Sequence, residues 1–381
     1  MKKPHFITLI VFATITLFTS CIQEEAPNAE CDIIAVKTSW LEDNKEMLSG
    51  KPIINNNAVR FYVNEDTDIE SLKQLDPQFE LTPGAQIEKL DRIEENGDRG
   101  IFLYYRTTAE DGFWKKDYEV SFTKRTVIPT DKVFSFEDFS LTSDKNLYYV
   151  WNENINNTLF NWWSSGNDGY KMAAYGKPAT AYPTTTHSEG YIGNCVKLTT
   201  CKTNSLAASF GMPIAAGNIF MGEFDNTNAM RAPLEATKFG LQIIPDKPVS
   251  LTGYYKYTPG EVFTDVEGNV IENRRDECAI YAVLFEVDPD NFIPLNGENV
   301  TSSNRIVLIA EIQNPGEPTE WTKFEIPFEQ RNGKIFDYEK LANNEYAITV
   351  VASSSKGGAF FEGAVGSTLM VDEIKIKWAQ E

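Results

Sequence analysis

Hydrophobic and polar residues alternate along most of the chain beyond residue 35, which is the pattern of half-buried β-strands. We expect no long helix, only one or two turns near Tyr338. Eight or more antiparallel strands in about 250 residues predict a jelly-roll sandwich for residues 133–381. These strands are predicted in "GNCVKLTTC", "KFGLQIIP", "VSLTGYYKYTPG", "CAIYAVLFEVD", "RIVLIAEI", "WTKFEIPF", "EYAITVVASS" and "TLMVDEIKIKW".

A second, smaller β-domain is predicted for residues 35–126. Val59, Phe61 and Val63 alternate with polar residues, and Asp111-Gly112 joins two strands in a hairpin. The stretch has the size of an immunoglobulin-like sandwich. The predicted fold is therefore all-β, with an Ig-like domain, a linker at residues 127–132 and a larger jelly-roll.

The first 21 residues have the pattern of an export signal rather than of the fold. Lys2 and Lys3 precede an apolar run, and small residues precede Cys21. The run from Phe6 to Phe18 is shorter than the about 20 residues that a membrane-spanning helix needs. Residues 22–34 form a polar tether.

"LFTSC" resembles the lipobox of bacterial lipoproteins, although Phe18 departs from the usual aliphatic residue. The following "IQEEA" is similar to the export signal of Bacteroides-type surface lipoproteins. The resemblance implies a lipidated Cys21 and a lipid-anchored, surface-exposed protein at the outer membrane. Plain cleavage, with Cys21 unmodified, is the alternative.

The charge balance bears on partners, because 55 acidic residues against 35 basic ones give a net charge of −20. Such a surface repels phosphate backbones, so we expect no nucleic acid partner. Neutral glycans and divalent cations are compatible with it.

Cysteine and histidine chemistry is not favoured. Cys195 and Cys201 are six residues apart in one predicted strand, so roughly 20 Å of extended chain would separate them, beyond disulfide reach. We expect free, buried thiols. Apart from His5 in the signal, His187 is the single histidine, and its loop carries no nucleophile signature.

Two longer resemblances accompany these patterns. "LKQLDPQFELTPGAQI" and "YYRTTAEDGFWKKDYEVSF" resemble the N-terminal Ig-like domain of Bacteroides surface lipoproteins, which implies a spacer. "FNWWSSGNDGY", "KFGLQIIPDKPVSLTGYYKYTPG" and "VASSSKGGAFFEGAVGSTLMVDEI" resemble the family called the putative carbohydrate metabolism domain. That family implies a jelly-roll related to carbohydrate-binding modules, with a polysaccharide or oligosaccharide partner and membrane contact through the lipid anchor only.

Aromatic residues gather in "FNWWSSGNDGYKMAAYGKPATAY", a stretch with loop composition. Trp and Tyr rings stack on the C–H faces of sugars, and Asn and Asp bind their hydroxyls. We expect one tryptophan of the adjacent pair to be exposed and one to anchor the core, since neighbouring strand residues face opposite ways. The candidate carbohydrate-binding residues are Trp162, Trp163, Asn167, Asp168, Tyr170, Tyr175 and Tyr182.

No pair of catalytic carboxylates stands out. A glycosidase needs two carboxyl groups, separated by roughly 5 to 10 Å. Several acidic residues lie near loops or apolar strands, and none is singled out: Glu189, Glu223, Asp225, Glu286 and Glu362. A non-enzymatic glycan-binding accessory protein is therefore favoured, with a glycoside hydrolase as the alternative and a structural adhesin or pilus-like component as the second alternative.

One carboxylate is expected in the core. Strict alternation in the last strand places Asp372 in one stripe with Met370, Ile374, Ile376 and Trp378. First and last strands are commonly neighbours in such sandwiches, so Glu137 in "FEDF" and Asp372 in "VDEI" are expected to meet. Two explanations stay open, a structural calcium ion or hydrogen bonds from backbone amides or a Tyr, Arg or Lys. No cofactor is expected to be required.

Overall fold

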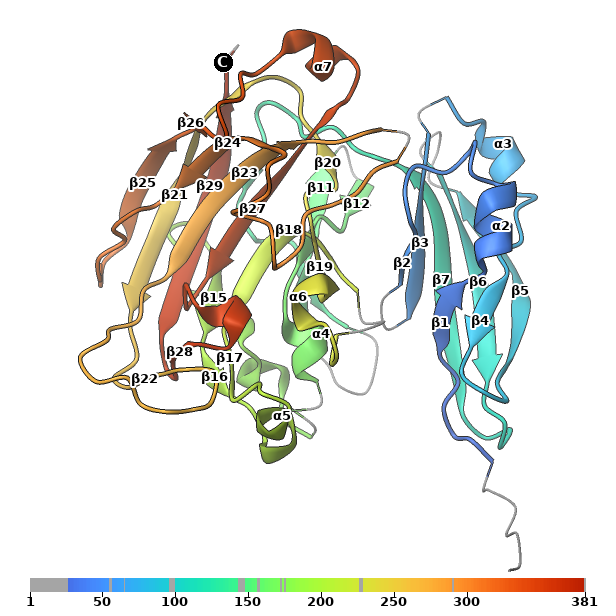
Figure 1. The fold of residues 1–381 in the computed structure, drawn as a ribbon, viewed down its shortest axis with the longest axis horizontal. Coiled ribbons are helices and arrows are strands. Elements are labelled where there is room, and N and C mark those ends of the chain that lie inside the picture. The colour runs from blue at the N-terminus through green and yellow to red at the C-terminus, as the bar shows by residue number, and fades with distance from the viewer. Residues whose placement is uncertain are drawn as a thin grey trace, which may run out of the picture.

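The computed structural model describes residues 27–379, except 55–56, 65, 96–99, 143–147, 156–157, 172, 175, 226–228 and 290. The predicted signal, Cys21 and Tyr175 lie outside the described residues. Two β-rich units lie side by side (Figure 1). Within the described ranges, no helix is long and apolar enough to cross a membrane.

The N-terminal unit is built on a five-stranded sheet whose central strands, β3 and β7, run parallel. Its order is β2 (Ile53–Ile54), β3 (Ala58–Val63), β7 (Lys115–Lys124), β6 (Gly100–Thr108), β5 (Gln86–Glu95). The predicted hairpin joins β6 and β7, and Gly112 turns it with a φ of +71°. A second ladder and two short helices complete the unit: β1 (Ile33–Val36), β4 (Phe79–Leu81), α2 (Thr38–Asp43) and α3 (Ile69–Leu72).

Aromatic packing forms the core of this unit. The rings of Phe61 and Phe122 stack with centroids 4.6 Å apart, and Trp40 meets Phe61 edge-on at 5.4 Å. These residues come from β3, β7 and α2, so one contact ties the helix to the sheet. The kinship to Ig-like domains stays a prediction.

The C-terminal unit is an all-β jelly-roll of two facing antiparallel sheets. The first contains β13 (Trp163–Ser164), β18 (Asn218–Phe224), β27 (Tyr346–Ser353), β23 (Ala279–Glu286), β24 (Ile306–Glu311) and β26 (Glu329–Gln330), with β19 (Thr237–Phe239) and β20 (Gln242–Ile243) alongside. The second contains β14 (Thr184–His187), β15 (Cys195–Thr199), β29 (Thr368–Trp378), β21 (Pro248–Thr258) and β25 (Thr322–Pro327), with β8 (Val133–Phe134) on β29. All eight predicted segments contain strands.

Shorter strands and helices lie outside the two main sheets. The paired strands are β9 (Phe139–Leu141) with β10 (Tyr149–Trp151), β11 (Glu153–Ile155) with β12 (Thr158–Phe160), β16 (Cys201–Lys202) with β17 (Ile214–Ala215), and β22 (Phe263–Thr264) with β28 (Gly363–Ala364). The helices are α4 (Asn167–Tyr170), α5 (Ser205–Ser209), α6 (Pro233–Ala236) and α7 (Tyr338–Ala342), and 3-10 turns span Ala179–Ala181 and Gly358–Phe360. The expected turn near Tyr338 is thus present.

Strand β29 departs from strict alternation. Leu369 and Val371 are fully buried, and so is Ile374, three residues on. The phase changes because Glu373 adopts a φ of +51° and the pairing with β21 shifts register opposite it, as at a β-bulge. The expectation that Met370 and Asp372 share one stripe with Ile374, Ile376 and Trp378 is therefore wrong, because both residues precede the bulge and alternate with Leu369 and Val371.

The N-terminal unit covers the outer face of the first sheet. Ile53 of β2 packs in one cluster with Phe220, Phe285 and Phe292 of the jelly-roll. Arg125 donates to the Ser49 Oγ at 2.6 Å and the Ser49 carbonyl at 3.2 Å, and its guanidinium lies 3.6 Å from the Phe292 ring centroid. The interface thus combines apolar packing with a half-buried cation that stacks on an aromatic ring.

Candidate functional site

Two adjoining cavities lie between the units. The larger has a volume of about 630 Å³ and the smaller about 240 Å³, and residues of both units line each one. Asp168, Lys171 and Phe224 line both cavities, so the two spaces meet at these side chains. Cavities of this size at domain interfaces are common positions for ligand sites.

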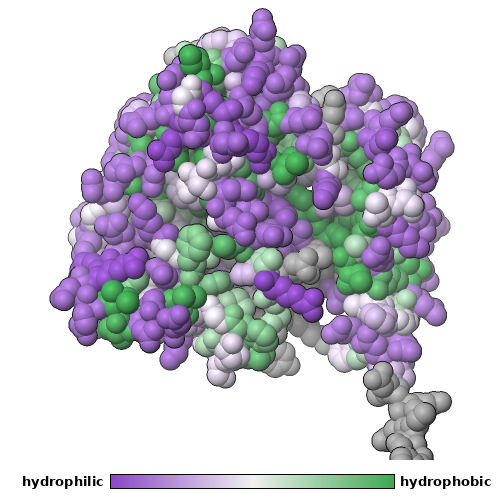
Figure 2. Space-filling model, in the orientation of Figure 1, coloured by the Kyte–Doolittle hydropathy of each residue, from purple (hydrophilic) through white to green (hydrophobic). Residues whose placement is uncertain are grey.

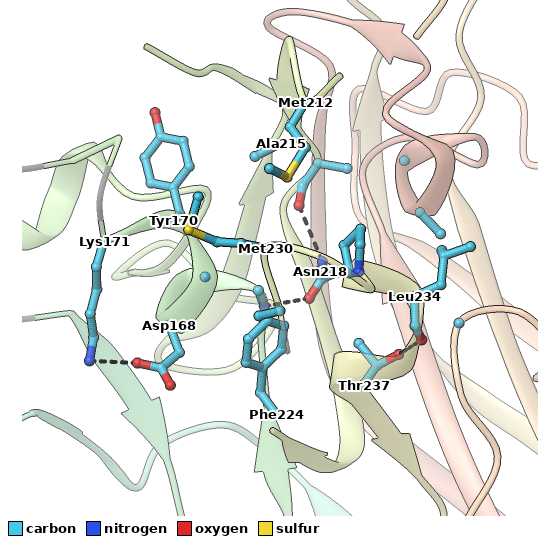
Figure 3. A pocket seen from close by; sticks show the side chains of 18 of the residues that line it. Asp168, Tyr170, Lys171, Met212, Ala215, Asn218, Phe224, Met230, Leu234 and Thr237 are labelled. Carbon is cyan, nitrogen blue, oxygen red and sulfur yellow. Dashed lines mark hydrogen bonds and ion pairs between the residues drawn. The ribbon is translucent and has the colours of Figure 1, made fainter. Parts of the chain in front are cut away.

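The larger cavity is formed around strand β18 and helices α4, α5 and α6 (Figure 3). Asn218 of β18 accepts a hydrogen bond from the Gly166 amide at 2.8 Å and donates one to the Ala216 carbonyl at 3.3 Å, which holds the start of α4 against the sheet. Gly169 permits close contact with Phe224, because a Cβ there would lie 3.0 Å from its ring. Side chains facing the space include Met212, Phe224, Met230 and Leu234.

The smaller cavity is polar and charged. Asp168 at the start of α4 forms an ion pair with Lys171 at 2.5 Å and accepts a hydrogen bond from the Tyr148 hydroxyl at 2.9 Å. Lys171 also lies 5.3 Å from the Tyr148 ring centroid. Glu119 and Arg60 of the N-terminal unit line the same space.

Glu223 of β18 is the second buried carboxylate at this cavity. Its exposed fraction is 6%, and burial raises the pKa of its carboxyl group while Arg60 opposes the shift. Arg60 lies 3.4 Å away, and the Tyr62 hydroxyl donates to Oε1 at 3.0 Å. Within the part of the chain that the structure describes, Oε2 has no hydrogen-bond partner.

The two predicted tryptophans are both buried, with exposed fractions of 3% for Trp162 and 2% for Trp163. The expectation that one is exposed is wrong, because Trp162 precedes the short strand β13 and is covered by Phe160, whose ring centroid lies 5.7 Å away. Trp163 donates from Nε1 to Glu153 at 2.6 Å. It lines the smaller cavity from within the core cluster.

The other predicted binding residues divide between structural and cavity positions. Asn167 is fully buried, accepting from the Thr184 amide at 3.1 Å and donating to its carbonyl at 2.8 Å. Tyr182 is buried against Tyr170, with ring centroids 5.8 Å apart. Asp168 and Tyr170 line the larger cavity.

Several cavity residues carry no sequence signal. Asn218, Phe224 and Met230 belong to no recognisable motif, and Arg60 and Glu119 come from the domain whose resemblance implies a spacer. Their shared property, facing the other unit, exists only after the units pack together.

The first and last strands are neighbours as predicted, since β8 pairs with β29. Asp372 accepts from the backbone amides of Ile192 at 3.0 Å and Glu373 at 2.8 Å, and burial raises its pKa to about 6. Glu137 accepts from the Asn194 amide at 2.7 Å and its side-chain Nδ2 at 2.6 Å. Among the described residues, no group of three or more His, Cys, Asp or Glu is placed to hold a metal. The contacts of Asp372 are hydrogen bonds from backbone amides, which is the second of the two explanations left open by the sequence.

Among the described residues, His187 of β14 is paired with Cys195 of β15, and burial raises the pKa of the Cys195 thiol, which opposes formation of a thiolate. The four described cysteines, Cys31, Cys195, Cys201 and Cys278, are free thiols, as expected, and all but the half-buried Cys201 are buried. His187 ends β14, and its Nδ1 accepts from the Glu189 amide at 3.2 Å.

The comparison with protein families matches residues 135–377 to the family described as "Putative carbohydrate metabolism domain". The chain belongs to this family. The matched region includes the jelly-roll wall of both cavities, and the N-terminal unit that completes them lies outside it. No curated protein matches the sequence.

Two solved structures resemble this family member. One is described as a "putative glycoside hydrolase" from Bacteroides thetaiotaomicron, with 40% identity and a TM-score of 0.76, covering 94% of this chain and 100% of its own. The second is a "putative glycoside hydrolase" from Bacteroides vulgatus, with 40% identity and a TM-score of 0.60, covering 66% of this chain and 98% of its own. The first similarity includes both units, so the two-unit arrangement is shared.

Proposed function

We propose that this protein is an exported lipoprotein, anchored at the outer membrane through Cys21, that binds an oligosaccharide or the end of a polysaccharide between its two units. The observation that carries the proposal is the pair of adjoining cavities at the interface, in a member of a carbohydrate-related family. The smaller cavity offers carboxylate, ammonium and guanidinium groups that can bind sugar hydroxyls.

Glycan binding is tested on the Cys21→Ser chain, which lacks the lipid acceptor and keeps both units. A glycan array followed by calorimetry should find a ligand whose Kd rises at least roughly tenfold in Asp168→Ala, the loss of about one charged hydrogen bond. The control is Asp131→Ala, because Asp131 is an exposed carboxylate. If no glycan binds the intact two-unit chain, the proposal is wrong.

The anchor is tested separately. Radiolabelled palmitate should be incorporated into the wild type and not into Cys21→Ala, and the variant should leave the membrane fraction. Unlabelled wild-type protein of the same electrophoretic mobility as the variant would show plain cleavage instead.

A second function, glycoside hydrolysis, is favoured by one observation. Glu223 and Asp168 line the same polar cavity, each beside a cation, Arg60 for Glu223 and Lys171 for Asp168, and burial raises the pKa of Glu223. A carboxyl group with a raised pKa suits the acid that protonates the leaving oxygen, and a glycosidase needs a second carboxylate in the same site to activate water or attack the sugar. The similarity to the two structures described as "putative glycoside hydrolase" supports the same alternative.

Product release separates binding from hydrolysis. If the bound glycan releases new reducing ends, and if Glu223→Gln and Asp168→Asn each abolish release while binding persists, hydrolysis replaces simple binding as the function. Binding without product release in the wild type supports the accessory role.

A further inference from the structure

Several polar side chains of the larger cavity already form hydrogen bonds within the fold, and charged side chains such as Glu30 and Lys356 line it elsewhere. Both groups of the Asn218 amide are used by Gly166 and Ala216. Thr203 donates to the Met212 carbonyl at 2.5 Å, and Thr237 donates to the Leu234 carbonyl at 3.3 Å. A sugar ring packed against these three side chains would lose water from its hydroxyls without gaining hydrogen bonds from them, which is costly.

Large apolar side chains stay exposed at the same cavity. Ile34 of the N-terminal unit is 42% exposed, Leu206 of α5 is 51% exposed, and Met230 is 44% exposed. Figure 2 shows hydrophobic surface on the lower part of the jelly-roll, where α5 lies, and a separate hydrophobic area on the N-terminal unit. Apolar side chains from three separate segments thus line one cavity. An apolar ligand group placed there would remove their surface from water, which is favourable.

The smaller cavity has the opposite character. Arg60, Glu119, Asp168, Lys171 and Glu223 line it, and its volume of about 240 Å³ suits a single sugar ring. Phe224, Asp168 and Lys171 stand where the polar and apolar spaces meet. A ligand that spans both spaces needs a polar end and an apolar end.

We propose that the ligand is a glycoconjugate, with its sugar in the smaller cavity and an alkyl or aromatic aglycone in the larger one. The inference rests on the proposed glycan-binding function and specifies the substrate class of the same site. Selectivity then comes from the aglycone, because each buried methylene adds affinity that a plain oligosaccharide does not have.

Calorimetry with methyl, butyl, hexyl and octyl β-D-glucosides and β-D-galactosides, below their micelle concentrations, tests the proposal. We expect the Kd to fall about three- to fourfold per methylene, from about 0.8 kcal/mol each. Equal Kd values from methyl to octyl, or no binding by either octyl glycoside, overturn it. If 1-octanol binds as tightly as the octyl glycosides, the sugar contributes nothing and the glycoconjugate assignment is wrong. If the Kd does not change with alkyl length while an unmodified oligosaccharide binds tightly, only the glycoconjugate assignment is wrong and the proposed glycan-binding function is retained.

A matched pair of variants on α5 places the aglycone. Ala207 lines the larger cavity, whereas its neighbour Ala208 is exposed. Ala207→Phe should fill the space and abolish the chain-length dependence while the methyl glycosides bind as before, and Ala208→Phe should match the wild type. Ala215→Leu, on β17, fills the cavity from a second element in case Ala207→Phe disturbs folding. Wild-type chain-length dependence in both filling variants overturns the placement.

Discussion

Glu137 and Asp372 hold the same loop, Glu137 through the amide of Asn194 and Asp372 through the amide of Ile192. The pairing of β8 with β29 brings the two carboxylates to this loop from opposite ends of the jelly-roll sequence. The buried carboxylate of Asp372 is therefore stabilised by backbone donors at the closure of the sandwich.

The pH dependence of stability should report the burial of Asp372. Its folded pKa of about 6 lies above its ordinary value of 3.8, so between these pH values the folded chain holds a proton that the unfolded chain has released. Protonated Asp372 therefore adds to the free energy of unfolding at low pH, and this contribution falls by about 3 kcal/mol as the pH rises through this window. Urea unfolding from pH 4 to pH 7 should show that the stability of the wild type relative to Asp372→Asn falls by about 2 kcal/mol, which is most of the full change. A constant difference would contradict the raised pKa.

Calcium removal should leave the protein unchanged, since backbone and side-chain amides already occupy the oxygens of both carboxylates. We expect the same Tm in EDTA and in millimolar calcium. A resident ion would stabilise the folded state by mass action, so a Tm that falls in EDTA and returns with calcium would restore the metal explanation.

Asp276 is predicted to be a structural carboxylate. It is buried, and its Oδ2 accepts hydrogen bonds from the Ser355 hydroxyl at 2.6 Å, the Ser367 hydroxyl at 2.7 Å and the Ala364 amide at 2.8 Å. Asp276→Asn replaces one accepting oxygen by a donor that faces the Glu277 amide, so unfolding should become about 2 to 4 kcal/mol easier. Asp131→Asn, at an exposed carboxylate, should change the free energy of unfolding little. Equal effects of the two variants would refute the structural role.

Arg125 is predicted to couple the two units. Arg125→Ala removes two hydrogen bonds to Ser49 and the contact with the Phe292 ring, which should cost about 2 to 4 kcal/mol and separate the calorimetric unfolding into two transitions. Glycan affinity should fall with it, because both cavities need both units.

The control for this coupling is Arg92→Ala. Arg92 also stacks on an aromatic ring, 4.0 Å from the Tyr104 centroid, but it lies on the exposed strand β5. We expect little change in the free energy of unfolding and a single transition. Similar behaviour of the two arginine variants would show that the units are not coupled through Arg125.

The strands of both units could be predicted because their signal is local. The eight jelly-roll strands, the hairpin at Asp111-Gly112 and the free cysteines follow from alternation, turn chemistry and the reach of an extended chain. The bulge at Glu373 could not, since a positive φ at one residue has no signature in the hydrophobic pattern. The prediction that one tryptophan is exposed was wrong for a related reason. Trp162 is buried by contact with the Phe160 ring, and the sequence pattern does not show that contact.

By itself, then, the sequence determined an all-β chain with two units, its strand segments and a family resemblance that the comparisons confirm. Only the tertiary structure decided where a ligand can bind. Asp168 and Glu223 are 55 residues apart and meet Arg60 of the other unit only after β18 docks against the N-terminal sheet. Alternation records which face of a strand is buried, and it holds no information about which distant surface buries it, so the cavities between the units had to be seen in three dimensions.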